Sequence, residues 1–502
     1  MSTIRRQNDF QLWSFHGPMK ILHLSWLAFF ISFVVWFNFA PLMAAIRETF
    51  QLTDQQVKLL LILNVALTIP ARILIGMLVD KHGPRITFSV LLALGSAICF
   101  LFAFADSFEK LAIYRFLLGF VGAGFVIGIR LVSEWFPARQ VGMAEGIYGG
   151  WGNFGSAFAA MTLPALAAWI GGADGWRYAV AATGAVALVY SFIFYAMVRN
   201  NPKGTTYYRP KNLGAMEVSS KKDFALYCFM SAPLYMALGV LAWKVGPANL
   251  GILSGLEVTV INGGLLILYA YQVMQIYRVN RGLFTPAAAP VPEIHRYPFK
   301  QVAVLDLAYM VTFGSELAVV SMLPLYFFDT FKASAHLTMT QAGLIASVFA
   351  GMNLIMRPAG GWLSDRFGRK RTLAATLIGA AVGYAGLAQM NATWPVSAAV
   401  AVVVFTSLFV NAGNGAVYAL VPLIKRRLTG QIAGMAGAFG NVGGVAFLTV
   451  LSFVTASKFF LVIGGAAALA WIVVIWALDE PRGYMYEQND DGSIERISLE
   501  SH

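Results

Sequence analysis

The sequence RILIGMLVDKHG at residues 72–83 recurs 285 positions later, at residues 357–368, as RPAGGWLSDRFG. Both copies contain Arg-x3-Gly-x3-Asp-x2-Gly. A second pair follows in the same order and at nearly the same offset, GIYGGWGNFG at residues 146–155 and GMAGAFGNVG at residues 434–443. Two motifs repeated in order predict an internal duplication. Such duplication is typical of secondary transporters, whose two halves enclose a substrate near the middle of the membrane.

The composition excludes an ordinary soluble protein. Of the 502 residues, 58% are hydrophobic and 12% are charged, whereas soluble domains have about 45–50% and about 25%. The net charge of +12 is spread in short basic clusters between apolar runs, so it predicts cytoplasmic loops and no nucleic-acid partner. The two cysteines lie in apolar runs and the six histidines are scattered, so we predict no disulfide, metal or cofactor. The chain is predicted to be an all-α polytopic membrane protein.

Fourteen apolar runs are long enough to cross a bilayer, which takes about 20 helical residues. They fall into groups of six, two and six, so two helices are inserted between two pseudo-symmetric six-helix halves. The predicted spans lie near residues 24–46, 58–79, 86–105, 110–132, 142–168, 176–198, 224–246, 254–277, 303–328, 340–364, 371–390, 396–423, 430–455 and 458–478.

Four segments follow from this pattern. They are an N-terminal half, a linker carrying the two inserted helices, a C-terminal half and a polar tail that we predict to be disordered, at residues 1–200, 201–300, 301–482 and 483–502. Lys and Arg are concentrated in alternate loops, which places those loops and both termini in the cytoplasm.

The first repeated motif also points to a family. GMLVDKHGPR (76–85) and GWLSDRFGRKR (361–371) resemble the loop motif of the major facilitator superfamily. The resemblance implies the major facilitator fold, with an aspartate that meets basic residues at a cytoplasmic gate. The residues placed at this gate are Asp80, Arg85, Asp365 and Arg369.

Two arginines lie deep in predicted spans at equivalent positions of the repeat. A buried arginine costs about 2.5–3.5 kcal/mol on insertion scales, so it faces a partner or a cavity. Neither Arg72 nor Arg357 has an acidic residue within one turn on its own helix. Their planar guanidinium groups suit a flat trigonal oxyanion through bidentate hydrogen bonds. The alternative is that each arginine snorkels to the interface or pairs with a distant carboxylate.

Polar and aromatic residues accompany these arginines. Asp306, Tyr309, Phe313 and Glu316 share one helical face, and Phe125 and Asn153 are placed to close a pocket. Aromatic stripes more often serve packing alone. Asn153 and Asn441 each lie among glycines inside a span and need a hydrogen-bond partner, which a bound anion or a neighbouring backbone could supply.

The second repeated motif gives a narrower resemblance. GGWGNFGSA (149–157) and GAFGNVGGV (437–445) are similar to the paired signatures of the nitrate/nitrite porter family, and YMVTFGSELA (309–318) and NAGNGAVYALVP (411–422) resemble its seventh and tenth helices. The resemblance covers residues 20–200 and 300–480 and departs at the two inserted helices. It implies substrate arginines at Arg72 and Arg357, with Asn153 as the signature asparagine. It also implies a substrate tyrosine at Tyr309 and aromatic walls at Phe125 and Phe313.

The leading hypothesis is a transporter of nitrate, and of nitrite, in the cytoplasmic membrane of a bacterium. It would work as a monomer, by rocking one half against the other, with Gly152 and Gly440 allowing close helix approach. The alternatives are a nitrate/nitrite exchanger, a formate or oxalate exchanger, and a nitrate sensor. The sequence has no recognisable signalling domain, which argues against the sensor. It also has no nucleophile constellation or phosphate loop, which argues against an enzyme.

Proton coupling is the remaining hypothesis. Uptake of an anion against a negative-inside potential needs a co-transported cation or an exchanged anion. Glu316 is the candidate proton carrier, with Asp306 a weaker one because it lies nearer the cytoplasmic end. The alternative is that Glu316 is a standing counter-ion of Arg115 or Arg357.

Overall fold

The computed structural model describes residues 11–53, 56, 60, 63–64, 67–207, 209, 215–249, 251, 253–285, 296–337, 339–451, 453–488 and 494–498. Twelve helices in this part are long and apolar enough to cross a membrane. The predicted spans near 58–79 and 340–364 are not among them. The first lies partly outside the described residues, and the second is divided at Met352. The count of fourteen therefore stays a prediction.

The first half contains eight α-helices and two short 3-10 turns in the described part. Their bounds are α1 (Gly17–Phe37), η1 (Ala40–Leu42), α2 (Met43–Phe50), α4 (Thr68–His82), α5 (Pro84–Ala103), α6 (Phe108–Leu118), η2 (Gly119–Ala123), α7 (Gly124–Trp135), α8 (Ala138–Ile170) and α9 (Gly175–Met197).

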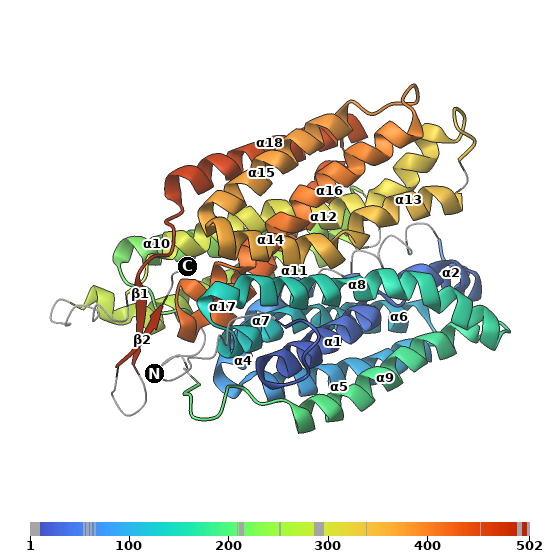
Figure 1. Cartoon of the computed structure of the whole chain (residues 1–502). Helices are drawn as coiled ribbons and strands as arrows, with labels where there is room; N and C mark the ends of the chain where they lie inside the picture. Colours follow the sequence, from blue (N-terminus) through green and yellow to red (C-terminus); the bar gives the residue numbers. More distant parts are fainter. Residues whose placement is uncertain are drawn as a thin grey trace.

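The second half repeats this arrangement of long helices. Its bounds are α12 (Phe299–Phe331), α13 (Met339–Gly351), α14 (Asn353–Phe367), α15 (Arg369–Ala388), α16 (Val396–Tyr418), η5 (Val421–Leu423), η6 (Arg426–Leu428), α17 (Thr429–Leu451) and α18 (Ala456–Ala477). The two halves lie side by side along their length, one above the other in Figure 1.

The last glycine of the first motif has the same structural reason in both halves. Gly83 joins α4 to α5 with φ +85°, and Gly368 joins α14 to α15 with φ +99°. Both values lie in the left-handed region that favours glycine. Each repeat therefore needs a glycine to make a sharp turn between consecutive helices.

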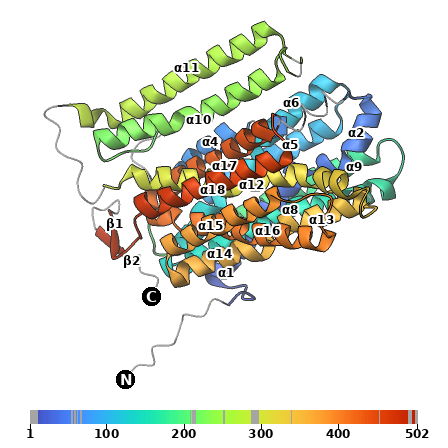
Figure 2. The ribbon, with the colours of Figure 1, turned by 90° about the horizontal axis from the view of Figure 1, so that it is seen from above.

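The insert stands at the edge of the bundle. Helices α10 (Lys221–Val245) and α11 (Gly255–Asn280), followed by η3 (Arg281–Phe284), form a pair at the periphery in Figure 2. Helix α10 packs against α12 and α17, whereas the most apolar window of α11 has no buried residue. The insert therefore extends the bundle without separating the halves.

The polar tail differs from the predicted disorder. Strands β1 (Tyr484–Gln488) and β2 (Ile494–Ser498) form an antiparallel hairpin with Tyr484 opposite Ser498. Met485 and Ile497 pack against Leu423. The tail contains too few apolar residues to predict a fold alone, so this structure depends on the surface that the helices provide.

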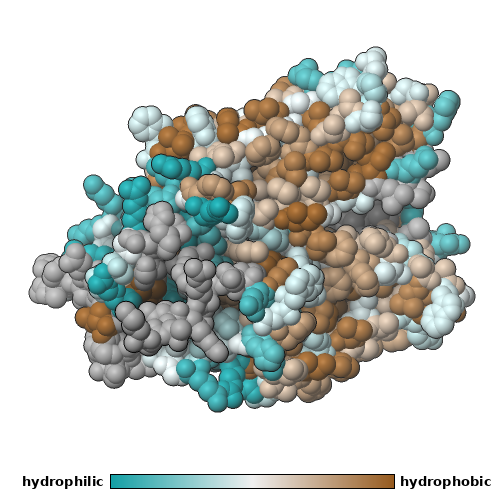
Figure 3. Space-filling model, viewed as in Figure 1, coloured by the Kyte–Doolittle hydropathy of each residue, from teal (hydrophilic) through white to brown (hydrophobic). Residues whose placement is uncertain are grey.

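The surface separates into polar and apolar regions. In Figure 3 hydrophilic residues gather at the end that carries α10 and the hairpin, and hydrophobic residues cover the flanks of the helices. An apolar belt with a polar end is the surface expected of a protein that spans a bilayer. The protein is therefore described as a multi-pass membrane protein.

Candidate substrate site and gate

Arg72 lies in α4 with 1% of its surface exposed. Its Nη1 donates to the carbonyl of Gly437 in α17 at 2.8 Å, and its Nε donates to the carbonyl of Gly122 at 3.4 Å. The 3-10 turn η2 contains Gly122 and presents this carbonyl. Arg72 thus bonds to backbone groups of both halves and forms no ion pair with a carboxylate in the described part of the chain.

Arg357 lies in α14 and is equally buried. Its Nη2 donates to the Tyr309 hydroxyl at 2.9 Å, whereas its Nη1 has no hydrogen-bond partner among the described residues. A buried, unpartnered guanidinium N–H is costly. An anion at this position would remove that cost.

The two arginines flank the same aromatic rings. The Cζ of Arg72 lies 5.6 Å from the centre of the Phe125 ring and 5.2 Å from that of Phe313. The Cζ of Arg357 lies 4.9 and 5.9 Å from the same two centres. The structure therefore brings Arg72, Arg357, Phe125, Tyr309 and Phe313 together at one centre between the halves, as the sequence predicts.

Tyr418 is a member of this centre that the sequence analysis did not single out. Its ring meets those of Phe125 and Tyr309 edge-on, with centres 4.5 and 4.8 Å apart. Phe313 and Tyr309 stack with centres 5.0 Å apart and an angle of 5° between the rings. The only signal was an aromatic residue in a helix rich in glycine and asparagine, which packing would also explain.

The two signature asparagines have different surroundings. The Nδ2 of Asn441 donates to the carbonyl of Gly437 at 3.0 Å. This is the same carbonyl that accepts from Arg72. The Nδ2 of Asn153 is buried and has no partner among the described residues. Asn153 lies one turn beyond Gly149, which packs on Arg357, and so occupies the same face of α8. The amide and the free guanidinium N–H are two donors available to an anion.

The signature glycines cross between the halves. A Cβ on Gly437 of α17 would lie 2.9 Å from the Cδ of Arg72, and one on Gly149 of α8 would lie 2.6 Å from the Nε of Arg357. Each signature helix thus packs on the arginine of the opposite half. Glycine is required there because a side chain would occupy the space of the guanidinium group.

We expect Gly152→Val and Gly440→Val to reduce nitrate transport by roughly 5- to 150-fold. A Cβ on Gly152 would overlap the Phe29 ring, and one on Gly440 would lie 2.8 Å from the rings of Tyr309 and Phe313. Overpacking of this kind costs about 1–3 kcal/mol. Uptake into proteoliposomes is the measurement. Gly465→Val is the control, because nothing lies within 4 Å of a Cβ there, and normal transport in both test variants would contradict the packing argument.

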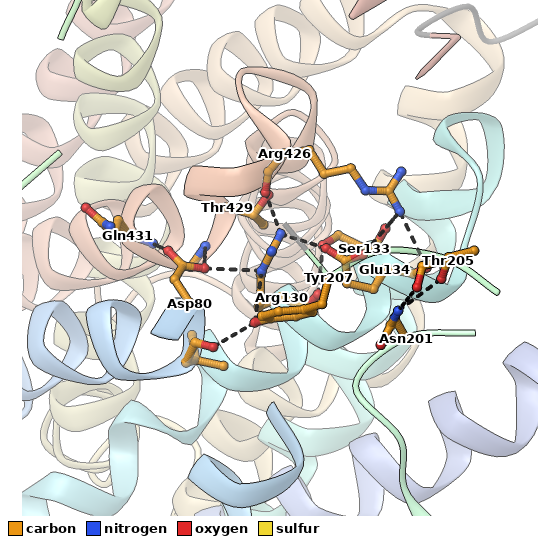
Figure 4. A network of polar contacts seen from close by, with 12 residues as sticks. Asp80, Arg130, Ser133, Glu134, Asn201, Thr205, Tyr207, Arg426, Thr429 and Gln431 are labelled. Atoms are coloured by element: carbon orange, nitrogen blue, oxygen red, sulfur yellow. Dashed lines mark hydrogen bonds and ion pairs between the residues drawn. The ribbon is translucent and has the colours of Figure 1, made fainter. Parts of the chain in front are cut away.

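The first aspartate of the repeated motif binds the start of a helix in the opposite half. Asp80 accepts from the backbone N–H groups of Gly430 and Gln431 in α17 at 3.1 and 2.9 Å. Arg130 of α7 forms an ion pair with Asp80 at 3.2 Å and another with Glu134 at 2.8 Å. Figure 4 shows this network. The carboxylate also benefits from the helix dipole of α17.

The linker after α9 completes the first gate. The hydroxyl of Tyr207 accepts from the Nε of Arg130 at 3.3 Å and donates to the carbonyl of Val79 at 2.6 Å (Figure 4). Burial raises the pKa of the Tyr207 phenol, so the hydroxyl keeps the proton that it donates. Sequence reasoning missed Arg130 and Tyr207, which lie far from the loop motif in the chain.

The second aspartate makes the equivalent contact in the other half of the repeat. Asp365 of α14 accepts from the N–H groups of Gly142 and Met143 in α8 at 3.2 and 2.9 Å, and pairs with Arg369 at 3.3 Å. Two crossed contacts therefore tie the halves together at the end that we predict to be cytoplasmic. Both central arginines are buried, so neither guanidinium group is open to solvent.

The structure corrects the prediction for Arg85. It does not meet Asp80. Its Nε donates to the carbonyl of Tyr195 at 2.6 Å, and its guanidinium lies 4.2 Å from the centre of the Tyr195 ring. The turn at Gly83 directs Arg85 onto α9 of its own half, so Arg130 takes the position at the aspartate.

Glu316 has amide partners. Its Oε1 accepts from the Nδ2 of Asn353 at 2.5 Å, and its Oε2 accepts from the Nδ2 of Asn414 at 2.6 Å. Asn353 precedes Arg357 by one helical turn, so the carboxyl group lies next to the arginine centre without an ion pair to either arginine in the described part. Arg115 bonds to Asn38, Asn64 and the carbonyl of Trp36 instead.

Known proteins resemble this chain over almost its whole length. The profile of the Major Facilitator Superfamily matches residues 25–279 and 305–498. The nitrate/nitrite transporter NrtP of Picosynechococcus sp. is 45% identical, over 95% of this chain and 96% of the relative. The protein of the same name from Nostoc punctiforme is 44% identical, over 94% and 95%.

Solved structures support the same fold. The fucose:proton symporter FucP of E. coli superposes with a TM-score of 0.61, over 92% of this chain and 100% of that one, at 14% sequence identity. At this identity the likeness concerns the fold alone. The named relatives are transporters and not enzymes. The chain belongs to the major facilitator superfamily and, within it, to the family of nitrate/nitrite porters.

Proposed function

We propose that this protein is a secondary active transporter that carries nitrate, and nitrite, into a bacterial cell together with protons. The observation that carries the proposal is the arginine centre. Two buried guanidinium groups from opposite halves flank the same rings, and one N–H of Arg357 lacks a partner in the described part. The names of the NrtP relatives supply nitrate and nitrite as the anions.

The crossed contacts suggest how access alternates. When Asp80 and Asp365 leave the helix starts of α17 and α8, the predicted cytoplasmic end opens and the glycine-lined helices move apart. The centre is formed within one chain, so we propose that a monomer is sufficient. Both termini are assigned to the cytoplasm by the distribution of Lys and Arg.

Nitrate/nitrite exchange is the second candidate. The same arginine centre would serve an exchanger, because an internal anion can replace the proton as the driving species. Buried Glu316 beside the centre favours proton coupling, since a carboxyl group there can take up and release a proton. Formate and oxalate also fit paired arginines by charge and shape.

The deciding measurement is flux in proteoliposomes that contain the purified protein. A proton gradient, acidic outside, is expected to drive nitrate and nitrite inward when no internal anion is present. Uptake that requires internal nitrite would establish exchange instead. Uptake of formate or oxalate in preference to nitrate would overturn the proposed substrate, and binding without any flux would indicate a sensor.

A further inference from the structure

Asp306 is a buried carboxyl group to which the arginine centre assigns no role. It lies seven residues after the first residue of α12, about 10 Å along the helix, and has no exposed surface. Neither of its oxygens has a hydrogen-bond partner among the described residues. A buried carboxylate without a partner carries a large cost, and such a group takes up a proton instead.

Asp306 has no ion pair with a compensating charge in the described part of the chain. The phenols of Tyr227 on α10 and Tyr418 on α16 lie near Asp306, and neither oxygen of Asp306 contacts a cation among the described residues. Glu316, by contrast, accepts two amide hydrogen bonds and lies near Arg357. The two acids of α12 are ten residues, about 15 Å, apart, on either side of the arginine centre.

A small cavity lies between the insert and helices α4 and α17. The cavity holds about 20 Å³, enough for roughly one water molecule. Tyr227, which lies near Asp306, forms part of the wall of the cavity, whereas Asp306 itself does not line it. The wall is mostly apolar, and its polar lining residues are Tyr227, Ser231, Tyr235, Gln272 and Gln431.

The cavity joins the insert to the gate. Tyr227 and Ser231 belong to α10, and Gln272 belongs to α11, so the inserted helices close the cavity against the membrane. The side-chain amide of Gln431 is buried with no partner in the described part, as expected where a water molecule completes the hydrogen bonds. The backbone N–H of Gln431 binds Asp80. Release of Asp80 would therefore open the cavity toward the predicted cytoplasmic end.

We propose that Asp306 is a second proton-binding site, and that the inserted helices form the wall of its exit to the cytoplasm. When the gate opens, the carboxyl O–H of Asp306 gives its proton to the hydroxyl of Tyr227, which passes its own proton to water in the cavity. This leaves a carboxylate at Asp306 to be reprotonated on the next cycle. The proposal rests on proton-coupled uptake. Glu316 on the far side of the arginines and Asp306 on the near side then carry two protons for one nitrate, which makes uptake electrogenic.

The test is Asp306→Asn, which keeps the size of the side chain and removes the titration. Proton and nitrate fluxes are measured together in proteoliposomes at set membrane potentials. We expect the proton-to-nitrate ratio to fall by about half and the dependence of uptake on potential to disappear, because one proton per anion moves no net charge. Asp106→Asn is the matched control, since Asp106 is exposed and pairs with Lys110 at a loop.

A second readout does not depend on transport. Infrared difference spectra on nitrate addition are expected to show a change in the C=O stretch of a neutral carboxylic acid, which Asp306→Asn abolishes. Tyr227→Phe, which removes a cavity hydroxyl and keeps the ring packed on Phe299, is expected to slow proton-driven uptake severalfold and to leave the infrared change in place.

The outcomes separate the two proposals. An unchanged flux ratio and voltage dependence in Asp306→Asn would overturn the role of Asp306 while leaving proton coupling intact. Wild-type protein that moves nitrate with no protons would refute the proposed coupling. In that case a carboxylic acid band that disappears in Asp306→Asn would still support a proton-binding Asp306, and its absence would overturn it.

Discussion

Replacement of Arg72 or Arg357 by lysine is expected to abolish nitrate uptake while leaving membrane insertion intact. Lysine keeps the positive charge but replaces the planar fork by a compact ammonium group that cannot bind an oxyanion through two parallel hydrogen bonds. Each arginine also makes a fixed contact, from Arg72 to the carbonyl of Gly437 and from Arg357 to the hydroxyl of Tyr309. Hydrogen bonds to charged groups contribute about 1.5–3 kcal/mol, so the loss in each variant is at least roughly 10- to 100-fold.

The measurement is nitrate uptake into proteoliposomes, normalised to the amount of inserted protein, with nitrate binding measured in parallel. Arg278→Lys is the control, because Arg278 is exposed on α11. This substitution makes the same chemical change at a position away from the arginine centre. If either central variant takes up nitrate at close to the wild-type rate, charge alone is sufficient and the paired-clamp geometry is wrong.

Sequence repetition predicted the two arginines because their position is encoded locally. Arg72 and Arg357 each stand four residues before the glycine of the repeated motif, and that spacing fixes their height within α4 and α14. The pseudo-symmetry then requires that they approach each other. The fold and this pair could be predicted without coordinates for that reason.

The cations of the gate depend on packing between distant elements and were predicted incompletely. Arg85 is close to Asp80 in sequence, but the turn at Gly83 sends it to Tyr195. Arg130 reaches Asp80 because α7 packs against α4 and α17. Nothing in the sequence around Arg130 indicates that proximity.

The contact of each signature helix with the opposite half is also a property of the assembled fold. The sequence indicates that glycines allow close approach, but not which helix approaches. The structure places the signature helix of each half on the arginine of the other, at Gly149 and Gly437. The hairpin near the end of the chain is a similar case. It is held by packing against Leu423 and by the hydrogen bond that Lys425 donates to the carbonyl of Tyr486.

Glu316→Gln is expected to reduce proton-driven nitrate uptake severely, because it removes the proton that assists nitrate binding, and to preserve nitrate/nitrite exchange. Glutamine has the size of glutamate and fits between Asn353 and Asn414, but it cannot bind or release a proton. With Glu316 ionised, the two arginines and one carboxylate leave one net positive charge for the anion. Protonation raises that charge by one and strengthens nitrate binding, so proton and anion are bound together. The measurement is uptake with a proton gradient, compared with exchange against internal nitrite.

Exchange activity in the same variant distinguishes this role from that of a standing counter-ion. A carboxylate that only neutralises an arginine would be needed in every conformation, and its removal would damage exchange and driven uptake alike. Arg115 donates to its own acceptors, the side chains of Asn38 and Asn64. The oxygens of Glu316 accept from the amides of Asn353 and Asn414 and, in the described part of the chain, from neither central arginine. The carboxyl group can therefore lose its charge without leaving a broken ion pair behind. Driven uptake that persists unchanged in Glu316→Gln would place proton coupling elsewhere on the chain, and loss of exchange would assign Glu316 a structural role.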